Sequence, residues 1–283
     1  MTVFSKRITF VIFTYNEEAR IERAIKSFIS YGKVLVVDNF STDATIDIAK
    51  RNGCDVLMNK NPGWVEDEVT TANVFDAITT PWVYWAYADE IIEKKSIEKI
   101  QYYIECNDYD IISIRRKNYY YGQFCYNAFS DRLNRVFRVG AIDFSGNKIH
   151  EFGKVLVAEN RIFTLPEEYY VHHFISNTAT SYLRVMDKYT DIQAPKEIKC
   201  KNPLLLILQS VRCFIVHYFI RGAFKAGVAG FYLVINMIYY SWLLNMKKYE
   251  LDHHVDFKTI EDLNNKHRDK ILEGEGGGHV VKE

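Results

Sequence analysis

WVYWAYADE, residues 82–90, is the stretch that decides the fold of this chain. Its apolar and aromatic run ends abruptly at two adjacent carboxylates, Asp89 and Glu90, and a charged helical pattern follows. A short apolar run bounded in this way predicts a buried strand that delivers Asp89 to its carboxyl end. In an open α/β sheet, ligands bind at that edge.

Adjacent carboxylates at a strand end suit a hard divalent cation. Mg²⁺ and Mn²⁺ prefer oxygen ligands and often share their coordination shell with substrate phosphates. Asp89 is therefore the candidate metal ligand. The alternative is that Asp89 and Glu90 only begin the next helix, where acidic side chains complement the helix dipole. The pair by itself leaves both interpretations open.

The composition fits one large α/β domain with an appendage. The chain has 283 residues, of which 48% are hydrophobic. Lys plus Arg and Asp plus Glu both number 36, so no overall field favours nucleic acid as a partner. The 5 cysteines have no Cys-x-x-Cys spacing, which argues against a disulfide framework and against a zinc site. We therefore expect a reduced, cytoplasmic protein.

Strand and helix patterns alternate before the central stretch. Residues 8–14 and 33–38 are apolar and β-branched, and residues 16–28 between them have helical spacing. This alternation predicts a parallel sheet whose strands end at one edge. The side chains expected there are Thr14, Tyr15, Asp38, Asn39, Asp89 and Glu90. The edge has neither G-x-G-x-x-G nor G-x-x-x-x-G-K-[ST], so dinucleotide and P-loop interpretations lack their usual support.

Several motifs follow one another in a familiar order. They are FTYNEE (13–18), VVDNFSTDAT (36–45) and ADE (88–90). Together they resemble the successive signatures of family-2 glycosyltransferases. KIHE (148–151), His173 and residues 221–231 resemble the branch that includes lipopolysaccharide core glucosyltransferases. The resemblance covers about residues 7–250.

The resemblance implies a nucleotide-sugar-binding domain of the GT-A type, with Mn²⁺ or Mg²⁺ as cofactor. The residues that it places against the nucleoside and its base are Thr14, Tyr15, Glu17 and Asp38. Ala88 and Asp89 match the end of the D-x-D metal motif. The chemistry agrees, because a carboxylate accepts from the N–H of uracil and a cation neutralises a diphosphate leaving group.

Three positions depart from the family pattern. Asn39-Phe40 replaces the usual Asp-Gly, and Ala72 stands where relatives often carry Lys or Arg. Tyr87 replaces the first acid of D-x-D. Because a tyrosine supplies no carboxylate, either the ion binds less tightly or water or Glu90 takes that ligand position.

An inverting transfer needs a base near the acceptor hydroxyl. Glu151 is the candidate base and His150 is its neighbour in the motif, with Asp131 and Asp143 in reserve. A lone His-Glu pair is otherwise often structural, and the match to the family motif is what favours a catalytic role here.

His173 is the candidate second metal ligand. It keeps the family's spacing to Tyr182 and Tyr189, so it is favoured over His172, and a neutral imidazole joins carboxylate and phosphate oxygens around Mn²⁺. The alternative is that both histidines are satisfied within a strand.

The chain changes character near Pro195. The pattern predicts a catalytic domain (1–195), a helical region that contacts a membrane or forms a homodimer (196–250), and a charged helix with a flexible tail (251–283). Residues 203–220 are apolar with a polar face, and residues 226–246 carry no charge. An interfacial helix is favoured over a true span or a dimer helix. The cations that would meet anionic headgroups are Arg221, Lys225, Lys247 and Lys248.

These features predict an inverting, metal-dependent hexosyltransferase. It would move a hexose from a nucleotide sugar, a UDP-sugar, to a saccharide or lipid-linked glycan of the cell envelope or surface polysaccharide, at the inner face of the cell membrane. The alternatives are a non-catalytic nucleotide-sugar-binding protein, a membrane-associated scaffold, and a nucleotidyltransferase, whose usual Gly-rich N-terminal loop is missing. The sugar, the acceptor and the linkage stay open.

Overall fold

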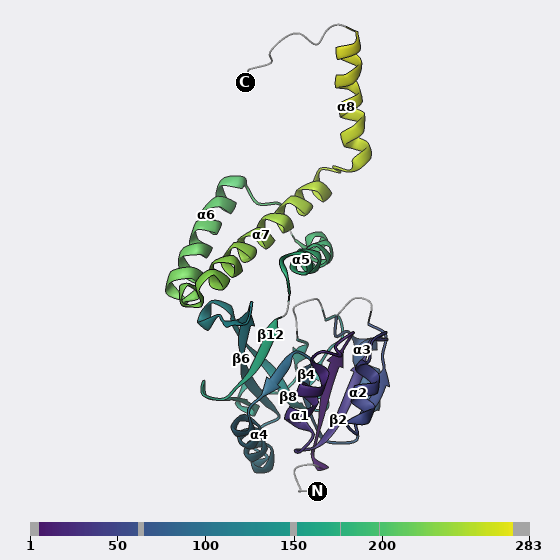
Figure 1. Ribbon diagram of the computed structural model, residues 1–283, viewed down its shortest axis with the longest axis vertical. Coiled ribbons are helices and arrows are strands. Elements are labelled where there is room, and N and C mark those ends of the chain that lie inside the picture. Colours follow the sequence, from purple (N-terminus) through teal and green to yellow (C-terminus); the bar gives the residue numbers. More distant parts are fainter. Residues whose placement is uncertain (1–5, 62–64, 148–151, 176, 198, 274–283) are drawn as a thin grey trace. The chain divides into compact units, whose positions relative to one another are not determined.

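The computed structural model describes residues 6–61, 65–147, 152–175, 177–197 and 199–273 (Figure 1). The chain divides into two compact units. The first holds the residues up to Thr178 together with Ile215–Val234, and the second holds Ala179–Phe214 and the residues from Ile235 onward.

The first unit is built on a mixed ten-stranded sheet. Its main strand order is β3 (Asp55–Met58), β2 (Lys33–Asp38), β1 (Ile8–Thr14), β4 (Trp82–Tyr87), β8 (Ser130–Arg138), β6 (Ile111–Tyr120), β12 (Tyr170–Ile175) and β5 (Glu90–Ile92). β11 (Ile162–Thr164) and β7 (Gln123–Phe124) also pair with β6, and β9 (Ile142–Asp143) pairs with β10 (Lys154–Val155). The strands β3, β2, β1 and β4 are parallel. The predicted α/β class is confirmed.

Helices connect the parallel strands, as the alternating pattern predicts. They are α1 (Ile21–Phe28), α2 (Thr45–Arg51) and α3 (Glu68–Asp76). α4 (Lys94–Cys106) lies between β5 and β6, and short 3₁₀ turns occupy 126–129, 159–161, 194–196 and 223–226. α1 begins five residues later than the sequence predicts. Asn16 has φ +55°, and its Oδ1 accepts from the backbone N–H of Thr42 at 2.8 Å. This bond ties the β1–α1 loop to the β2–α2 loop and delays the helix.

The central strand β4 is covered on both faces. Its alternate residues Trp82 and Tyr84 belong to one core cluster, and Val83 and Trp85 belong to the other. Tyr84 contacts Phe28 of α1 with ring centroids 5.0 Å apart, and Trp85 stacks on Phe144 at 5.4 Å. Burial on both faces explains why residues 82–87 read as an unbroken apolar run and not as an alternating one.

The C-terminal helices are divided between the two units. α6 (Pro203–Phe214) continues as a π-helical segment (Ile215–Ile220), and α7 (Gly227–Asp252) runs from the first unit into the second. Residues 215–234 group with the first unit through particular contacts. His217 Nδ1 lies 2.9 Å from the carbonyl oxygen of Ala128, and the Lys225 ammonium lies 5.4 Å from the ring centre of Tyr126.

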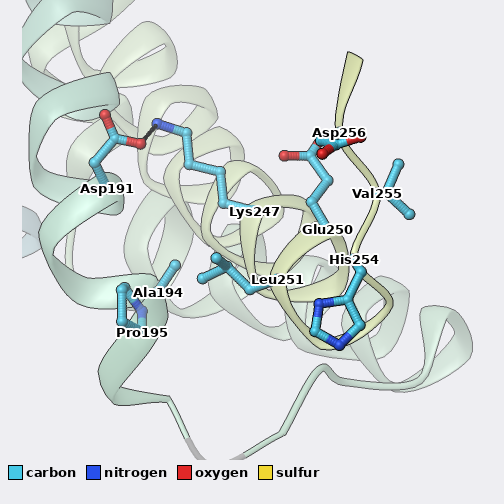
Figure 2. A pocket seen from close by; sticks show the side chains of 9 residues that line it. All are labelled: Asp191, Ala194, Pro195, Lys247, Glu250, Leu251, His254, Val255 and Asp256. Atoms are coloured by element: carbon cyan, nitrogen blue, oxygen red, sulfur yellow. Dashed lines mark hydrogen bonds and ion pairs between the residues drawn. The ribbon is translucent and has the colours of Figure 1, made fainter. Parts of the chain in front are cut away.

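The second unit is held by polar contacts between α5 (Ala179–Gln193), α6 and α7. Trp242 Nε1 donates to Ser210 Oγ at 2.8 Å, and Tyr240 donates its hydroxyl to Gln193 at 2.7 Å. A hollow of about 380 Å³ lies within this unit (Figure 2). Its lining residues are Asp191, Ala194, Pro195, Lys247, Glu250, Leu251, His254, Val255 and Asp256. Lys247 bridges to Asp191 at its edge, with Nζ to Oδ1 at 2.6 Å.

The helix expected over 251–272 is interrupted. His254 has φ +54°, and α8 (Phe257–Leu272) begins anew after Asp256, whose carboxylate accepts from the backbone N–H of Thr259 at 2.7 Å. Such a cap satisfies one of the unpaired N–H groups at a helix start. α8 is therefore an independent helix and not a continuation of α7.

A buried ion group fastens β4, β5, β6 and β8 together. Glu90 is fully buried, and its Oε1 lies 3.1 Å from Arg135 Nη2 and 3.5 Å from Arg116 Nη1. The backbone N–H of Tyr87 donates to the other carboxylate oxygen at 3.2 Å. Arg135 is only 2% exposed and also donates to the carbonyl of Trp85 at 3.0 Å. Neither the Glu90 carboxylate nor the Arg135 guanidinium has access to water as a substitute partner.

We predict that Glu90→Gln lowers the free energy of unfolding of the first unit by about 3–5 kcal/mol, because it leaves Arg135 buried without a counter-charge. Urea titration followed by tryptophan fluorescence measures this change. The matched control is Glu167→Gln. The Glu167 side chain is 79% exposed and pairs with Arg115, so its loss should lower the free energy of unfolding by less than about 1 kcal/mol. Equal effects of the two substitutions would contradict the prediction.

Candidate functional site

The carboxyl ends of β1, β2 and β4 meet at one edge of the sheet. Thr14 pairs with Asp38 across β1 and β2, and Phe13 pairs with Tyr87 across β1 and β4. The backbone N–H of Ala88 donates to the carbonyl of Phe13 at 3.2 Å. The structure therefore places the residues expected at this edge on neighbouring strand ends.

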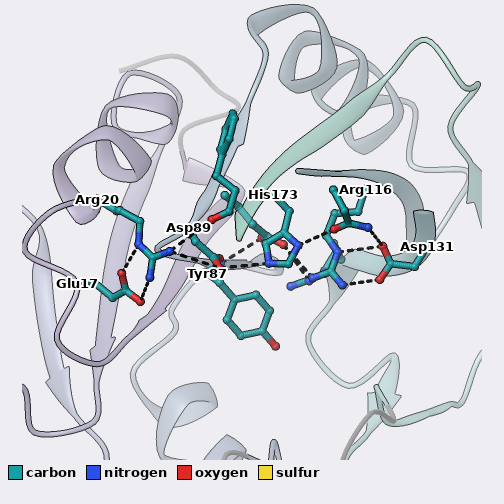
Figure 3. A network of polar contacts seen from close by, with 11 residues as sticks. Glu17, Arg20, Tyr87, Asp89, Arg116, Asp131 and His173 are labelled. Carbon is teal, nitrogen blue, oxygen red and sulfur yellow. Dashed lines mark hydrogen bonds and ion pairs between the residues drawn. The ribbon is translucent and has the colours of Figure 1, made fainter. Parts of the chain in front are cut away.

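Asp89 and His173 face one another at this edge (Figure 3). Asp89 Oδ2 lies 3.2 Å from His173 Nε2 and 4.0 Å from Arg20 Nη1. Burial raises the pKa of Asp89, but the hydrogen bond and charge of His173, with Arg20, outweigh it and hold the pKa below its ordinary value. The carboxylate is therefore ionised at neutral pH.

The other nitrogen of His173 is fixed by Asn118. His173 Nδ1 lies 2.6 Å from Asn118 Oδ1, and the amide nitrogen of Asn118 donates to the carbonyl of Phe129 at 2.9 Å and to Asp131 at 3.3 Å. These bonds orient the amide so that its oxygen accepts from Nδ1–H. In a neutral imidazole, Nε2 then carries a lone pair toward the Asp89 carboxylate. Two facing lone pairs at 3.2 Å need a proton or a cation between them.

Glu17 and Arg20 form the side of the site next to the β1–α1 loop. Arg20 Nε and Nη2 each donate to the Glu17 carboxylate at 2.6 Å. Burial is the main cause that raises the pKa of Glu17, against the opposing effect of Arg20. The backbone N–H of Glu17 donates to Thr45 Oγ1 at 2.7 Å, which fixes this loop to α2. Arg20 thus links the predicted nucleoside loop to Asp89.

Asp38 is fully buried beneath the edge. Its two carboxylate oxygens accept from the backbone N–H and the hydroxyl of Ser41, at 2.7 and 2.6 Å. The hydroxyl of Thr14 is also buried, and among the described residues it has no hydrogen-bond partner. Tyr15, in contrast, is 40% exposed. This edge of the sheet therefore has the partly exposed ring of Tyr15 and the buried carboxylate of Asp38, which shapes the loop from β2 to α2.

Glu66 is a site residue that the sequence analysis missed. Its carboxylate hydrogen-bonds the hydroxyl of Tyr87, and its backbone carbonyl accepts from Asn147 Nδ2 at 2.8 Å. Glu66 lies in a charged segment that resembles the start of a helix, so no local pattern marks it. Only a contact between the loop after β3 and the end of β4 reveals its place.

Glu90 does not replace the missing first acid of D-x-D. Its carboxylate is fully buried between Arg135 and Arg116, so the sequence-based alternative that Glu90 becomes a metal ligand is wrong. Within the described parts of the chain, no group of three or more His, Cys, Asp or Glu side chains forms a ready metal cluster.

The predicted base lies outside the described residues, because Glu151 and His150 fall within 148–151. The two reserve candidates for the base, Asp131 and Asp143, already have hydrogen-bond partners. Partial burial raises the pKa of Asp131, but two bonds from Arg116 at 2.9 and 2.5 Å lower the pKa below its ordinary value. The backbone N–H of Ser145 lowers the pKa of Asp143. A lowered pKa makes each a weaker proton acceptor.

His172 has a structural role on the neighbouring position of β12. Its Nε2 lies 2.9 Å from Glu93 Oε1, and its Nδ1 lies 2.9 Å from the hydroxyl of Tyr119. Both ring nitrogens are thus occupied. Of these two adjacent histidines, His173 is the one that contacts Asp89.

We predict that His173→Gln raises the pKa of Asp89, because His173 contributes the largest effect that lowers it. A ¹³C NMR titration of the Asp89 carboxyl carbon measures the midpoint. Since the folded-state pKa is depressed, the stability from this contact is present above the unfolded value of about 3.9 and is lost as pH falls through the folded value. His172→Gln is the control and should leave Asp89 unchanged. An unmoved midpoint in His173→Gln would refute the assignment.

Comparison with known proteins gives consistent matches. The model of glycosyl transferase family 2 matches residues 9–157, which is more than half of the 283 residues. An uncharacterized glycosyltransferase of Rickettsia bellii is 28% identical over 244 residues, which cover 81% of this chain and 81% of the relative. Glycosyltransferase SunS of the Bacillus subtilis SPbeta prophage is 31% identical over 150 residues, or 51% of this chain and 34% of SunS.

Solved structures of glycosyltransferases are also among the proteins to which this chain is similar. S. aureus TarS 1–349, in complex with UDP-GlcNAc, has a TM-score of 0.48 at 16% identity, covering 74% of this chain and 66% of that chain. Glucosyl-3-phosphoglycerate synthase of Mycobacterium tuberculosis, in complex with Mn²⁺, UDP and phosphoglyceric acid, has a TM-score of 0.32 at 22% identity, covering 41% and 44%. By the extent of the family match, this chain belongs to glycosyl transferase family 2.

Proposed function

We propose that this glycosyltransferase is inverting and metal-assisted, and that it transfers a hexose from a UDP-sugar to a saccharide or lipid-linked glycan. The observation that carries the proposal is the pair of Asp89 and His173. It sits at the strand edge where α/β sheets bind ligands, and it is arranged to share a cation. The resemblance of residues 148–151, His173 and residues 221–231 to the lipopolysaccharide core branch supports a proposed cell-envelope or surface polysaccharide acceptor.

The donor set fits Mn²⁺ or Mg²⁺. Asp89 Oδ2 and His173 Nε2 would hold the ion, and Asn118 fixes His173 as outer partners of metal-binding histidines commonly do. With only these two described side chains available, the remaining positions fall to diphosphate oxygens and water. When bound, the ion neutralises charge on the departing diphosphate.

The chain's own residues would bind and orient the donor. Asp38 and Ser41 hold the β2–α2 loop in shape beside Tyr15, whose exposed ring can stack on a base. The buried hydroxyl of Thr14 offers a hydrogen bond at the same edge. Arg20 adds a positive charge 4.0 Å from Asp89, where diphosphate oxygens would arrive. These features together favour an anionic nucleotide ligand.

Glu151 is proposed as the base that accepts the acceptor's hydroxyl proton, with His150 beside it. The chain on both sides of this segment is fixed. Asn147 Oδ1 accepts from the backbone N–H of Gly153 at 3.0 Å, and Gly153 has φ +62°. A Cβ at Gly153 would lie 2.4 Å from Ile142 Cγ2, so only glycine fits at this position of the backbone. This bond joins the described residues on the two sides of the segment.

A lipid-linked acceptor agrees with the apolar surface of the C-terminal helices. Residues 203–220 and 223–252 are helical stretches long and apolar enough to cross a membrane, with mean hydropathies of 1.7 and 1.4. Only 6% of the first stretch is buried. Its exposed side chains include Leu204, Leu208, Val211, Phe219 and Ile220. We infer that this surface lies in the interface of the cytoplasmic membrane.

The basic residues expected to meet anionic headgroups are not equally available. Lys247 is 2.6 Å from both Asp187 and Asp191, and Lys248 is 2.8 Å from Asp252. These ion pairs neutralise both lysines within the second unit. Headgroup attraction therefore falls to Arg221 and Lys225, which follow the exposed apolar segment, and the apolar contact carries most of the binding.

We predict that Asp89→Asn lowers transfer by about 10²–10³-fold while the chain stays folded, since it removes the charge that holds the ion. A thermal-shift screen of nucleotide sugars with Mn²⁺ identifies the donor, and release of the nucleotide measures turnover. Asp47→Asn, on the exposed face of α2, is the matched control and should keep full activity. Full activity of Asp89→Asn would refute the mechanism. Donor binding without turnover on any acceptor would favour a non-catalytic binding protein.

We predict that Leu204→Glu combined with Leu208→Glu reduces recovery of the full chain with floated vesicles of phosphatidylethanolamine and phosphatidylglycerol by at least about tenfold. Each buried Leu contributes about 1.5–3 kcal/mol. Leu263→Glu, a change of an exposed Leu on α8, is the control and should float like the wild type. Equal flotation of all three proteins would contradict interfacial binding through α6.

A further inference from the structure

The contact between Glu66 and Tyr87 is the strongest feature of the site that the proposed mechanism does not use. Tyr87 ends β4, two residues before Asp89, and its hydroxyl hydrogen-bonds Glu66 Oε1. The two residues are 21 positions apart in the sequence. Glu66 is only partly buried, so its carboxylate can contact a ligand while it also accepts from Tyr87.

The direction of this hydrogen bond follows from the chemistry of the two groups. A phenol O–H donates and a carboxylate oxygen accepts, so Tyr87 is the donor and Glu66 Oε1 is the acceptor. Among the described residues, the second oxygen of Glu66, Oε2, has no hydrogen-bond partner. It remains an acceptor with an unused lone pair in the described part of the site.

Both partners are held rigidly. The Arg135 guanidinium lies 4.6 Å from the centre of the Tyr87 ring, and Arg135 is itself fixed by Glu90 at 3.1 Å. The backbone of Glu66 is fixed by Asn147, the residue immediately before the 148–151 segment. An acceptor oxygen that is fixed in this way loses little entropy when it binds a ligand.

The chemistry of the pair suits a sugar hydroxyl better than a phosphate or a metal. A carboxylate repels diphosphate oxygens, and its neighbour Tyr87 is a hydroxyl that supplies no negative charge to an ion. The second oxygen of the Glu66 carboxylate can accept from one alcohol, and the phenol oxygen of Tyr87, whose hydrogen is donated to Glu66, can accept from a neighbouring alcohol. A nucleotide sugar carries such adjacent hydroxyls on its ribose and on its hexose.

We propose that Glu66, held by Tyr87, binds a hydroxyl group of the nucleotide-sugar donor and fixes the donor's position without taking part in proton transfer. This inference rests on the proposed function, because it requires a nucleotide sugar at the β4 edge. It assigns to Glu66 and Tyr87 a binding role in place of the carboxylate that family members carry at the position of Tyr87.

Calorimetry on the full chain tests the proposal with four probes: UDP, 2′,3′-dideoxy-UDP, UDP-glucose and UDP-N-acetylglucosamine, each with Mn²⁺. The variants are Glu66→Gln and Tyr87→Phe, which keep the shape of each side chain. The matched control is Glu68→Gln, the same change at an exposed residue of α3. Loss of a charged hydrogen bond should weaken binding about tenfold in Glu66→Gln, and raise KM with kcat little changed.

The probes separate the two sources of the hydroxyl. A contact with ribose weakens UDP binding in Glu66→Gln and leaves 2′,3′-dideoxy-UDP unaffected, whereas a contact with the hexose weakens only the UDP-sugars. Either pattern supports the proposal. If the wild type binds UDP or a UDP-sugar and both variants bind equally well, or if Glu66→Gln loses kcat with unchanged binding, the proposal is wrong while the proposed function stands. If the wild type binds none of the probes, both are wrong.

Discussion

The buried carboxylate of Glu90 sets the geometry of the candidate site. It is held by Arg135 and Arg116 and by the backbone of Tyr87, so the chain cannot continue straight from β4. It turns instead into β5, which pairs with β12 so that Glu90 lies opposite His173. The backbone N–H of Phe174 then donates to the carbonyl of Asp89 at 2.9 Å. The ion group therefore places the imidazole beside Asp89.

The same arrangement leaves the candidate site with one acid fewer than the family pattern. Tyr87 takes the position of an acid, and Glu90 is committed to the arginines, so Asp89 is the one carboxylate of the 87–90 segment that faces His173. Arg20 offsets part of its charge from the other side. A diphosphate arriving here meets less repulsion than it would from two or three clustered acids, and the site needs less charge from a cation.

The sequence predicted the strands well because they are short, apolar and closely bounded. β1 and β2 have the residues that the pattern indicated, and the alternation of strand and helix predicted the parallel half of the sheet. The meeting of Asp89 with His173 was a different kind of prediction. The two residues are far apart in sequence, and only the resemblance to a family connected them before the structure did.

Other features depend on contacts that no local pattern encodes. The role of Glu66 follows from a bond to Tyr87, and the confinement of Glu90 follows from arginines on two later strands. The late start of α1 depends on the positive φ of Asn16 and its bond to Thr42. In each case the deciding partner lies on another element, so periodicity and capping signals could not reveal it.

The apolar C-terminal helices pose a physical problem that the proposed contact with a lipid surface would resolve. Large side chains of α6 such as Leu204, at 65% exposure, would contact water in a freely soluble protein. The segment that follows α6, residues 215–234, belongs to the same unit as the candidate site. Contact of that segment with a membrane would bring the glycosyltransferase unit to the surface where a lipid-linked acceptor resides. Restricting both partners to one surface raises their effective concentration, so a weak acceptor contact is sufficient for transfer.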